Sequence, residues 1–478
     1  MSFQLSSELD CNNVFIVKRS NLEGRIDPHF YEPKFIENEN KLRKIGSTRL
    51  SNQSLSIFSG ITPKSGGDAY CYSEIGVPFV RSGDFLEDGE LDFTQLLYIK
   101  PAIHNGIMKS SKIKKNDVLI AIVGATIGKV GIYKDNKDAN INQAIAAIRL
   151  KPSLKPEFVR AFLLTSMGQK VIDRIKRPVA RANLNLEEVS SFLIPRFSSV
   201  KQNLITDVMD AGYAAKKQKE TEAQRLLDSI DGYLLAELGI ELPEQVENAL
   251  QSRIFRAQFK IVTGKRLDPI FYFSDLNRFN AGTYESESLQ AVSISFVSGV
   301  GAGKQDQSDE RQGIIQIRPT NINRDGALKY DKNIYLPEDF KGEKIEVDDV
   351  LFNNTNSQVL VGKTTILKEE KELFFSNHIT KIKVNKRKIY PDYLEIILNA
   401  YQKSKIFYSI CTNWNNQSGI GLDVLKSLMI PVPPLEKQTE IANHITQIRN
   451  QAKQLQQQAK AELEQAKKEV EAMILGEA

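Results

Sequence analysis

The feature that most constrains this chain of 478 residues is an internal repetition at about half its length. The segment Ile194-Pro195, with Gln202 behind it, recurs as Ile430-Pro431, with Gln438 behind it. Five further matches keep the same order, with a spacing that drifts by only a few residues: Arg25-Ile26-Asp27-Pro28 with Arg266-Leu267-Asp268-Pro269, Val80-Arg81 with Ile317-Arg318, Asp117-Val118-Leu119 with Asp349-Val350-Leu351, Ile127-Gly128-Lys129 with Val361-Gly362-Lys363, and Pro156-x-Phe158 with Pro391-x-Tyr393. Conserved order at nearly constant spacing predicts two copies of one fold.

The two predicted copies, at roughly 20–240 and 260–475, have the same internal layout. Each begins with short apolar or alternating runs bounded by Gly, Asn, Asp and Pro, which is typical of half-buried strands. These runs are Val77–Val80, Val118–Val123, Ile145–Leu150, Gly313–Ile317, Val350–Phe352 and Ile379–Val384. A helix that starts at a proline is predicted next in each copy, over Pro156–Ile172 and Pro391–Ile410. The predicted class is α+β, with two tandem mixed α/β domains.

A long helix is predicted at the end of each copy. In the second copy, apolar residues recur every three or four positions from Ile441 to Ile474, after Pro433-Pro434 and before Gly476. The equivalent stretch of the first copy fits this pattern at both ends and is polar in the middle. The predicted seam consists of Ile205, Met209, Leu227, Ile230, Leu234, Ile441, Ile445, Ile448, Leu455, Leu463 and Val470.

Two such helices in one chain favour an antiparallel coiled coil between the copies, with a pseudo-two-fold axis. The predicted division is a first recognition domain at 1–195, a first spacer helix at 196–240, a second recognition domain at 241–430 and a second spacer helix at 431–478. Two plainer interpretations stay open. The helices could cover ordinary cores, or they could form a coiled coil between two copies of the chain.

Composition and motifs exclude several classes of protein. Hydrophobic residues make up 41% of the chain, no apolar run is long enough to span a membrane, and the first residues lack a signal-peptide pattern. Three dispersed cysteines and four dispersed histidines argue against a disulfide framework and a metal centre. We therefore expect a cytoplasmic protein. HExxH, GxSxG, CxxC and Asn-Pro-Pro-aromatic motifs are absent. The segments that end at Lys129, Lys304 and Lys363 depart from the pattern of phosphate-binding loops.

Without a catalytic motif, a binding protein is the better prediction, and its net charge of +5 is compatible with nucleic acid. Lysines and arginines cluster in both copies, at Lys109, Lys112, Lys114 and Lys115, and at Lys381, Lys383, Lys386, Arg387 and Lys388. These clusters could contact phosphates or could be solvated faces. Asn- and Gln-rich turns at 140–143 and 353–358 could read base edges or could be ordinary turns.

The helix start Ile430-Pro-Val-Pro-Pro-Leu-Glu-Lys-Gln438 resembles the distal region of the specificity (S) subunit of type I restriction-modification systems. Ile194–Gln202 matches the same place without the Pro-Pro-Leu. The segments Ala125–Val130 and Asn140–Gln143 resemble the family's TIGK and NQ pattern, and Ser59–Pro63 resembles its SGGTP-like start. The second copy matches these only in part, at Val361-Gly362-Lys363, Ser376-Asn377 and Ser298-Gly299-Val300-Gly301. The resemblance covers about 20 to 475.

This resemblance implies a non-catalytic subunit that reads a bipartite, asymmetric site in double-stranded DNA. The long helices would set the gap between the half-sites and dock two copies of a modification subunit. That partner, and not this chain, would bind S-adenosylmethionine, and the assembly leaves a place for a restriction or translocase subunit. The expected DNA-contacting residues are Lys64, Arg81, Lys109, Lys112, Lys114, Thr126, Lys129, Asn142, Gln143, Lys304, Arg318, Asn354, Lys363, Asn377, Lys381 and Lys383. The alternatives are a coiled-coil scaffold that binds only protein and a stand-alone DNA-modifying enzyme.

Overall fold

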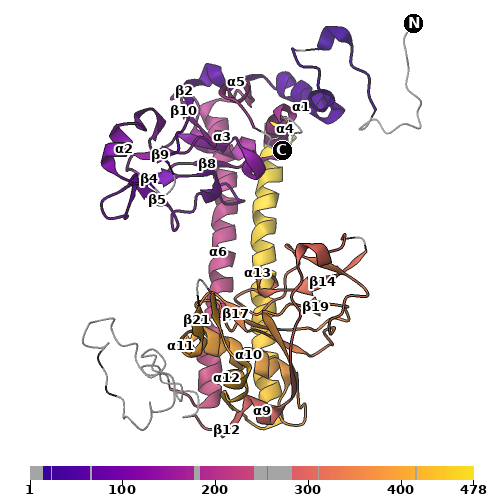
Figure 1. Cartoon of the computed structure of the whole chain (residues 1–478). Helices are drawn as coiled ribbons and strands as arrows, with labels where there is room; N and C mark the ends of the chain where they lie inside the picture. The colour runs from indigo at the N-terminus through magenta and orange to yellow at the C-terminus, as the bar shows by residue number, and fades with distance from the viewer. Residues whose placement is uncertain are drawn as a thin grey trace. The chain divides into compact units, whose positions relative to one another are not determined.

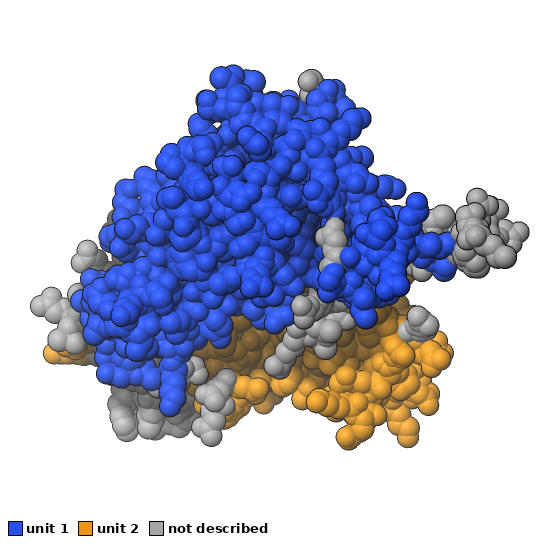
Figure 2. Space-filling view, turned by 90° about the horizontal axis from the view of Figure 1, so that it is seen from above, with its two compact units in different colours: residues 1–221, 455–478 blue, residues 222–454 orange. Residues whose placement is uncertain are grey.

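The computed structural model describes residues 14–22, 24–64, 67–176, 183–241, 254, 256, 282–310, 312–414 and 417–477. The chain forms two compact units (Figures 1 and 2). Unit 1 comprises 1–221 and 455–478, and unit 2 comprises 222–454. Two long helices, α6 (Ser199–Leu238) and α13 (Leu435–Leu475), each contribute one part to each unit. The second Arg-x-Asp-Pro segment, at 266–269, lies outside the described residues.

Unit 1 contains two main sheets. The first is antiparallel, with the order β2-β10-β7-β8, and the second has the order β3-β5-β4-β9-β6. Strands β4 and β9 of the second sheet run parallel. The bounds are β2 Ser54–Ser59, β3 Tyr70–Cys71, β4 Val77–Val80, β5 Leu97–Ile99, β6 Lys112–Ile113, β7 Val118–Ala121, β8 Val130–Ile132, β9 Ala139–Ile141 and β10 Ile145–Leu150.

Unit 2 contains an antiparallel sheet with the order β13-β20-β16-β18, in which each strand occupies the place of its counterpart in unit 1. A three-stranded sheet, β15-β14-β19, again pairs two of its strands in parallel, β14 with β19. A further sheet, β17-β22-β21, completes the unit. The bounds are β13 Ser293–Ser298, β14 Gly313–Ile317, β15 Tyr335–Pro337, β16 Val350–Asn353, β17 Thr355–Asn356, β18 Thr364–Ile366, β19 Phe374–Phe375, β20 Ile379–Val384, β21 Thr412–Trp414 and β22 Gln417–Gly419. All six predicted strand runs are confirmed, with β7 two residues shorter than predicted.

Short elements flank the sheets in both units. Strand β1 pairs with β11 in unit 1, and β12 pairs with β23 in unit 2, so that each Ile-Pro segment closes a two-stranded ladder. The bounds are α1 Pro33–Lys44, β1 Ser47–Arg49, α2 Pro101–Asn105, α5 Leu186–Ser190, β11 Leu193–Pro195, β12 Ser286–Ser288, α9 Leu289–Val292, α12 Leu422–Lys426 and β23 Met429–Pro431.

The helices after the sheets differ from the sequence prediction, which placed one continuous helix in each copy. Unit 1 has α3 (Pro156–Leu164) and α4 (Ser166–Ile175). Between them, Thr165 is extended, and its hydroxyl accepts a hydrogen bond from the Gly168 amide at 3.2 Å, which caps the second helix. Unit 2 likewise has α10 (Pro391–Lys403) and α11 (Ile406–Ile410), separated by Lys405 in the left-handed region. The prediction of single helices was therefore wrong, because local capping and turn geometry ended them.

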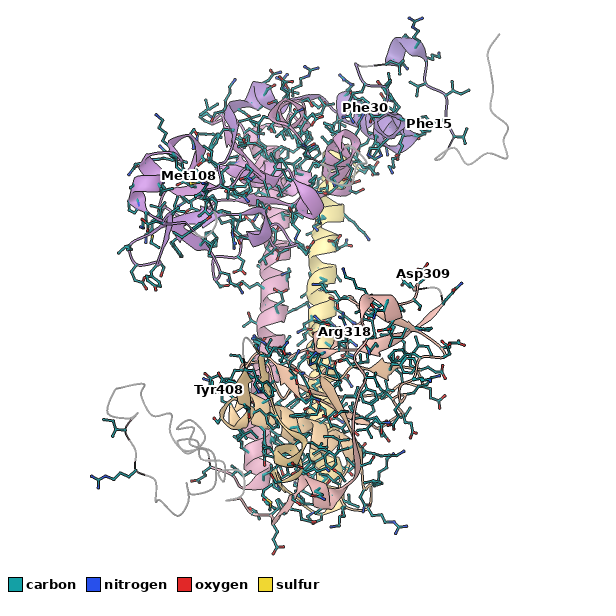
Figure 3. The ribbon with its side chains drawn as sticks, viewed as in Figure 1. Phe15, Phe30, Met108, Asp309, Arg318 and Tyr408 are labelled. Carbon is teal, nitrogen blue, oxygen red and sulfur yellow. The ribbon has the colours of Figure 1, made fainter. Side chains whose placement is uncertain are left out.

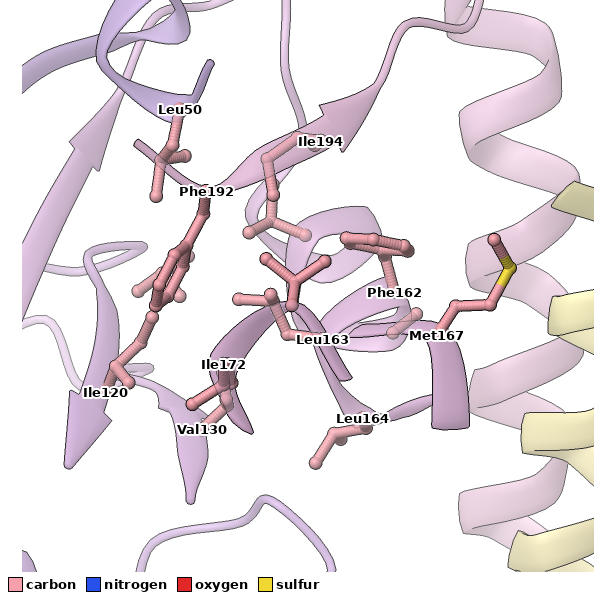
Figure 4. Close-up of a cluster of buried hydrophobic side chains, with 14 of the residues drawn as sticks. Leu50, Ile120, Val130, Phe162, Leu163, Leu164, Met167, Ile172, Phe192 and Ile194 are labelled. Atoms are coloured by element: carbon pink, nitrogen blue, oxygen red, sulfur yellow. The ribbon is translucent and has the colours of Figure 1, made fainter. Parts of the chain in front are cut away.

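The core of unit 1 lies between its sheet and helices α3 and α4. Figure 4 shows Phe162 and Leu163 of α3, Ile172 of α4 and Phe192, which directly precedes β11, converging there. Within this unit, Ile205 and Met209 of α6 join Leu463 and Val470 of α13 in the same apolar cluster. In unit 2, the cluster includes Ile230 and Leu234 of α6 and Ile441, Ile445 and Ile448 of α13. The seam residues thus also belong to the cores of the units, while Leu227 and Leu455 are half-buried.

The two long helices contact each other within each unit. In unit 1, a Cβ on Gly212 would lie 2.5 Å from the Ala466 side chain, and the Lys219 ammonium donates to the Gln458 side chain at 3.1 Å. In unit 2, Lys437 pairs with Glu237 at 2.5 Å. Rising residue numbers in α6 therefore face falling numbers in α13, which is the antiparallel sense.

A buried glutamine explains why each Ile-Pro segment is followed by Gln. The Gln202 side-chain oxygen accepts from the Lys155 amide at 2.9 Å, and its amide group donates to the carbonyls of Ser153 and Phe197. Gln438 makes the same set of bonds in unit 2, accepting from the Tyr390 amide at 2.7 Å. Each glutamine satisfies backbone groups where the long helix meets the start of α3 or α10, and a buried group left unpaired there would cost stability.

Two glycines of the repeated Gly-Lys pair allow a matched test of packing. Gly128 and Gly362 both have positive φ, at 93° and 89°. A Cβ on Gly362 would lie 2.1 Å from the Phe407 ring, whereas on Gly128 the nearest atom is the Gln169 side-chain oxygen at 3.1 Å. We expect Gly128→Ala to cost about 1–2 kcal/mol through the backbone conformation. Gly362→Ala should cost about 1–3 kcal/mol more through overpacking. Hydrogen exchange of the adjoining strands measures both, and equal losses would contradict this expectation.

Candidate nucleic-acid interface

In unit 1, several polar residues meet where the parallel strands β4 and β9 end. Val80 pairs with Ile141, so the next residues, Arg81 and Asn142, emerge at the same edge of the sheet. The Asn142 amide donates to the Val80 carbonyl at 3.1 Å. Because the two strands point the same way, residues that are far apart in sequence are brought together here.

The loop after β2 covers this edge. A Cβ on Gly60 would lie 1.9 Å from the Ile141 carbonyl oxygen, so only glycine allows this approach. The Ile61 amide then donates to the same carbonyl at 3.2 Å, and the Thr62 hydroxyl contacts the side chain of Gln143. Thr62, Lys64 and Gln143 are exposed. The resemblance segment starting at Ser59 thus serves to bring polar groups to the ends of β4 and β9.

Unit 2 repeats this arrangement with β14 and β19. Ile317 pairs with Phe375, and the Ser376 amide donates to the Ile317 carbonyl at 2.9 Å. A Cβ on Gly299 would lie 2.3 Å from the Phe375 carbonyl oxygen. The residues that emerge at this edge are Arg318 and Ser376, followed by the exposed Asn377. We call the two arrangements the strand-end sites: Thr62, Arg81, Asn142 and Gln143 in unit 1, and Arg318, Ser376 and Asn377 in unit 2.

Both strand-end sites contain buried polar atoms without a partner. Among the described residues, the unpartnered side-chain atoms include Arg81 Nε and Asn142 Oδ1 in unit 1, and Arg318 Nε and Ser376 Oγ in unit 2. Buried polar groups in proteins are normally hydrogen-bonded, so unpaired ones need an explanation. These atoms occur at corresponding positions of both units, directly after the two strands that pair in parallel.

The lysines of the Gly-Lys pair support the turns that carry these arginines. Lys129 Nζ donates to the Phe85 carbonyl at 3.3 Å and pairs with Glu87 at 2.5 Å. Lys363 Nζ donates to the carbonyls of Pro319 and Ile322 at 2.8 and 2.5 Å. Burial, and then the charges of Lys329 and Arg324, lower the pKa of Lys363 to about 8. The ammonium of Lys363 is therefore buried against its own turn, and its contact with DNA stays a prediction.

The lysine cluster of unit 1 remains available for phosphate. Lys109 and Lys114 are exposed, and the partners of Lys112 and Lys115 are the neutral side chains of Asn105 and Asn136, at 2.6 and 2.9 Å. The cluster begins directly after Met108, which Figure 3 labels in unit 1. The buried Asn140 fixes this turn by donating to the Met108 carbonyl at 2.8 Å.

The basic cluster of unit 2 is neutralised by acids of the same unit. Lys381 is buried and pairs with Glu343 at 2.5 Å and with Asp349 at 3.5 Å. Lys383, Lys386 and Lys388 pair with Glu346, Asp348 and Glu287 at 2.6–2.8 Å. This cluster also lies on and after β20, whereas the cluster of unit 1 precedes β7. The two clusters therefore do not occupy equivalent places in the fold, and the contact of Lys381 and Lys383 with phosphate stays a prediction.

The remaining candidates fall into two groups. Asn354 is nearly buried and donates to the Thr380 hydroxyl at 2.9 Å, and its contact with DNA stays a prediction. Thr126 is half-buried, with its hydroxyl on the Val123 carbonyl at 3.2 Å, and Lys304 is exposed. No structural observation tests whether these two residues contact DNA, and for them the prediction stands.

Sequence reasoning missed Thr62, Ser376 and the acid beside Arg81. Arg81 donates from Nη2 to Asp84 Oδ1 at 3.1 Å, and the Asp84 carboxylate also accepts from the Arg81 amide at 2.7 Å. The spacing of three residues between Arg81 and Asp84, with Asn321 in the equivalent place after Arg318, was the signal that could have revealed this pair. Ser376 was noted only as part of the partial match Ser376-Asn377, and its place beside Arg318 depends on the pairing of β19 with β14.

Across the described ranges, no group of three or more His, Cys, Asp or Glu residues could hold a metal ion. The helices within those ranges are too short or too polar to cross a membrane.

Comparisons with known proteins converge on one family. The family model for the type I restriction modification DNA specificity domain matches residues 63–226 and again 303–465. The specificity subunit of the type I restriction enzyme EcoBI from Escherichia coli is 31% identical over 159 residues, which is 33% of this chain and 32% of that protein. The EcoKI specificity subunit from Escherichia coli K12 is 21% identical over 398 residues, covering 81% of this chain and 79% of that protein.

A solved structure described as the basis of complex assembly and conformational transition of the type I R-M system shares the fold. Its TM-score is 0.50 at 15% sequence identity, and the match covers 90% of this chain and 98% of that chain. Because the match to EcoBI spans only about a third of that relative's length, the activity and partners of the whole relative are carried over only as proposals.

Proposed function

Since the chain belongs to the type I restriction-modification DNA specificity family, we propose that its two units each read one half of a bipartite, asymmetric site in double-stranded DNA. The observation that carries this proposal is the repeated strand-end site, with unpartnered buried polar atoms at corresponding positions of both units. The two separate matches of the family model, one in each half of the sequence, support two readers. Internal duplication would account for the shared strand order.

The two long helices are proposed to have a separate role from that of the strand-end sites. We infer that α6 and α13 form an antiparallel coiled coil that fixes the gap between the half-sites and docks two modification subunits. At about 1.5 Å per residue, the 40 residues of α6 extend over about 60 Å. The chain itself is proposed to be non-catalytic, and S-adenosylmethionine would be bound by the modification subunits.

Methylome sequencing tests this function. Cells that carry this gene together with its modification subunit should show one new methylated motif, made of two short half-sites with a fixed gap between them. The matched control is the same strain with this gene deleted, which should lose the motif while the modification subunit is still expressed. A contiguous motif, or methylation that persists in the deletion strain, would refute the proposal.

Salt dependence distinguishes the two basic clusters. The triple change Lys109→Gln, Lys112→Gln, Lys114→Gln should reduce the slope of log affinity against log salt by up to about 2.7, because each phosphate contact contributes about 0.9. The control is Lys383→Gln, Lys386→Gln, Lys388→Gln, whose lysines already have acidic partners and should change the slope by less than about 1. Fluorescence anisotropy with duplex DNA at several salt concentrations gives both slopes. The expectation fails if the control triple has the larger effect.

A further inference from the structure

The two strand-end sites differ in the charge beside their arginine. In unit 1, Asp84 accepts from both the backbone amide and the guanidinium of Arg81. In unit 2, the equivalent place is taken by Asn321, whose side-chain oxygen accepts from the Arg318 amide at 3.0 Å. The amide group of Asn321 points the other way and donates to the Lys329 carbonyl at 3.0 Å. Replacement of Asp by Asn keeps the turn and removes the counter-charge.

Cations lie near Arg318, and the residues of the turn that directly follows it, Pro319, Thr320 and Asn321, include no acid. Lys363 lies beneath this turn, bonded to the carbonyls of Pro319 and Ile322, and the nearby Lys329 and Arg324 contribute to lowering its pKa. Burial lowers the pKa of Arg318, and no acidic group offsets this effect. An arginine nevertheless stays protonated in a protein. Arg318 is half-buried, and its Nε is buried without a partner, so the guanidinium is held at this strand end without an ion pair that would balance its charge.

The neighbours of Arg318 at the ends of β14 and β19 are neutral hydrogen-bonding residues. Ser376 follows β19 directly, with its hydroxyl oxygen unpartnered, and the exposed Asn377 comes next. Hydroxyl and amide groups can contact phosphates as well as base edges. Only a base contact would make the preference for one base depend on Arg318. Arg318 is labelled in Figure 3, on unit 2.

We propose that Arg318 is a specificity-determining residue that donates two hydrogen bonds to the major-groove edge of a guanine, in the half-site read by unit 2. This inference rests on the proposed function. It specifies which residue reads the DNA, in which unit it lies and which base it contacts. Guanine is the base whose O6 and N7 acceptors match two parallel donors of a guanidinium. Arg81, whose charge is already balanced by Asp84, is expected to have the smaller effect when it is removed.

The test is methylome sequencing of strains that carry Arg318→Ala, Arg318→Lys or Arg324→Ala together with the modification subunit. Arg324 is a matched control, because it is an exposed arginine of the same turn region and lies outside the strand-end site. We expect Arg318→Ala to lower the preference for guanine at one position of one half-site by roughly 5- to 150-fold, which is the discrimination of a bidentate pair. The other half-site and the gap should be unchanged, which also shows that the variant folds and assembles.

Three outcomes would overturn this assignment. One is an unchanged motif in Arg318→Ala. The second is a uniform loss of methylation at every sequence, with Arg324→Ala normal. The third is a loss of the guanine preference in Arg324→Ala as large as in Arg318→Ala, because Arg324 lies outside the strand-end site. Failure of the proposed function is distinguishable from all three, since the unmodified chain would then give no bipartite motif.

Discussion

Deleting 219–225 from α6 together with 452–458 from α13 is expected to shorten the gap between the two half-sites by about three base pairs. Seven residues of helix span about 10.5 Å, and successive base pairs rise by about 3.4 Å. The two segments are matched because Lys219 contacts Gln458. A deletion of seven residues turns the chain by nearly two full turns, so the apolar faces stay almost aligned.

The measurement is methylome sequencing of the double-deletion strain with the modification subunit present. Both half-site sequences should persist, since neither strand-end site is altered. The control is the deletion of 219–225 alone. It changes the register of α6 against α13 and should abolish methylation. An unchanged gap in the double deletion would refute the role of the helices in setting the distance.

Replacing Arg449 by Leu is expected to destabilise unit 2 by about 3–5 kcal/mol at neutral pH, because it leaves a buried carboxylate without its partner. Glu395 on α10 is 2% exposed, and its carboxylate accepts from Arg449 Nη1 at 2.7 Å and from the Asn399 side chain at 2.6 Å. By contrast, the exposed Arg43 of unit 1 pairs with Glu39 on one helix, and Arg43→Leu should cost less than about 1 kcal/mol.

The destabilisation of unit 2 by Arg449→Leu should be larger at neutral pH than at acidic pH. Burial raises the pKa of Glu395 above its ordinary value of 4.5 even with Arg449 present, and removal of Arg449 raises it further. Between 4.5 and this raised value, the folded state binds more protons than the unfolded state, so stability falls as the pH rises. The stability lost in Arg449→Leu should therefore become smaller below pH 4.5, where Glu395 is protonated in both the folded and the unfolded state.

Hydrogen exchange of the α10 amides at several pH values measures this effect. The double variant Glu395→Gln, Arg449→Leu should recover most of the stability at neutral pH, because a neutral glutamine can still accept from Asn399. A double variant that is as unstable as Arg449→Leu would show that packing, and not the unpaired charge, is responsible.

The corresponding position in unit 1 shows why this pair was not predictable. Arg160 on α3 takes the place of Glu395, and it lies 4.6 Å from the centre of the Tyr213 ring on α6. Tyr213 in turn takes the place of Arg449. The contact between α3 and α6 in unit 1 is therefore a cation–π contact, whereas the contact between α10 and α13 in unit 2 is an ion pair. The alignment of the two copies predicted the equivalent positions, and the partners became known only from the packing.

The sequence by itself determined the repeated order of short motifs, all six predicted strand runs and the extent of α13. These features depend on local periodicity and on short motifs, because a strand or a helix repeats its burial pattern every two or every three to four residues. The family resemblance rested on the same kind of information, since the Ile-Pro and Gln residues occupy fixed positions relative to the long helices.

The tertiary structure decided which polar residues are available to a ligand. Lys388 is neutralised by Glu287, which lies 101 positions away, and Lys363 is buried against a turn more than 40 positions upstream. The strand-end sites likewise exist because two strands pair in parallel and deliver Arg81 and Asn142, or Arg318 and Ser376, to one edge. Charge runs and turn residues have the same local pattern whether they are free or paired. Their role therefore depends on contacts between distant segments, which only the folded chain brings together.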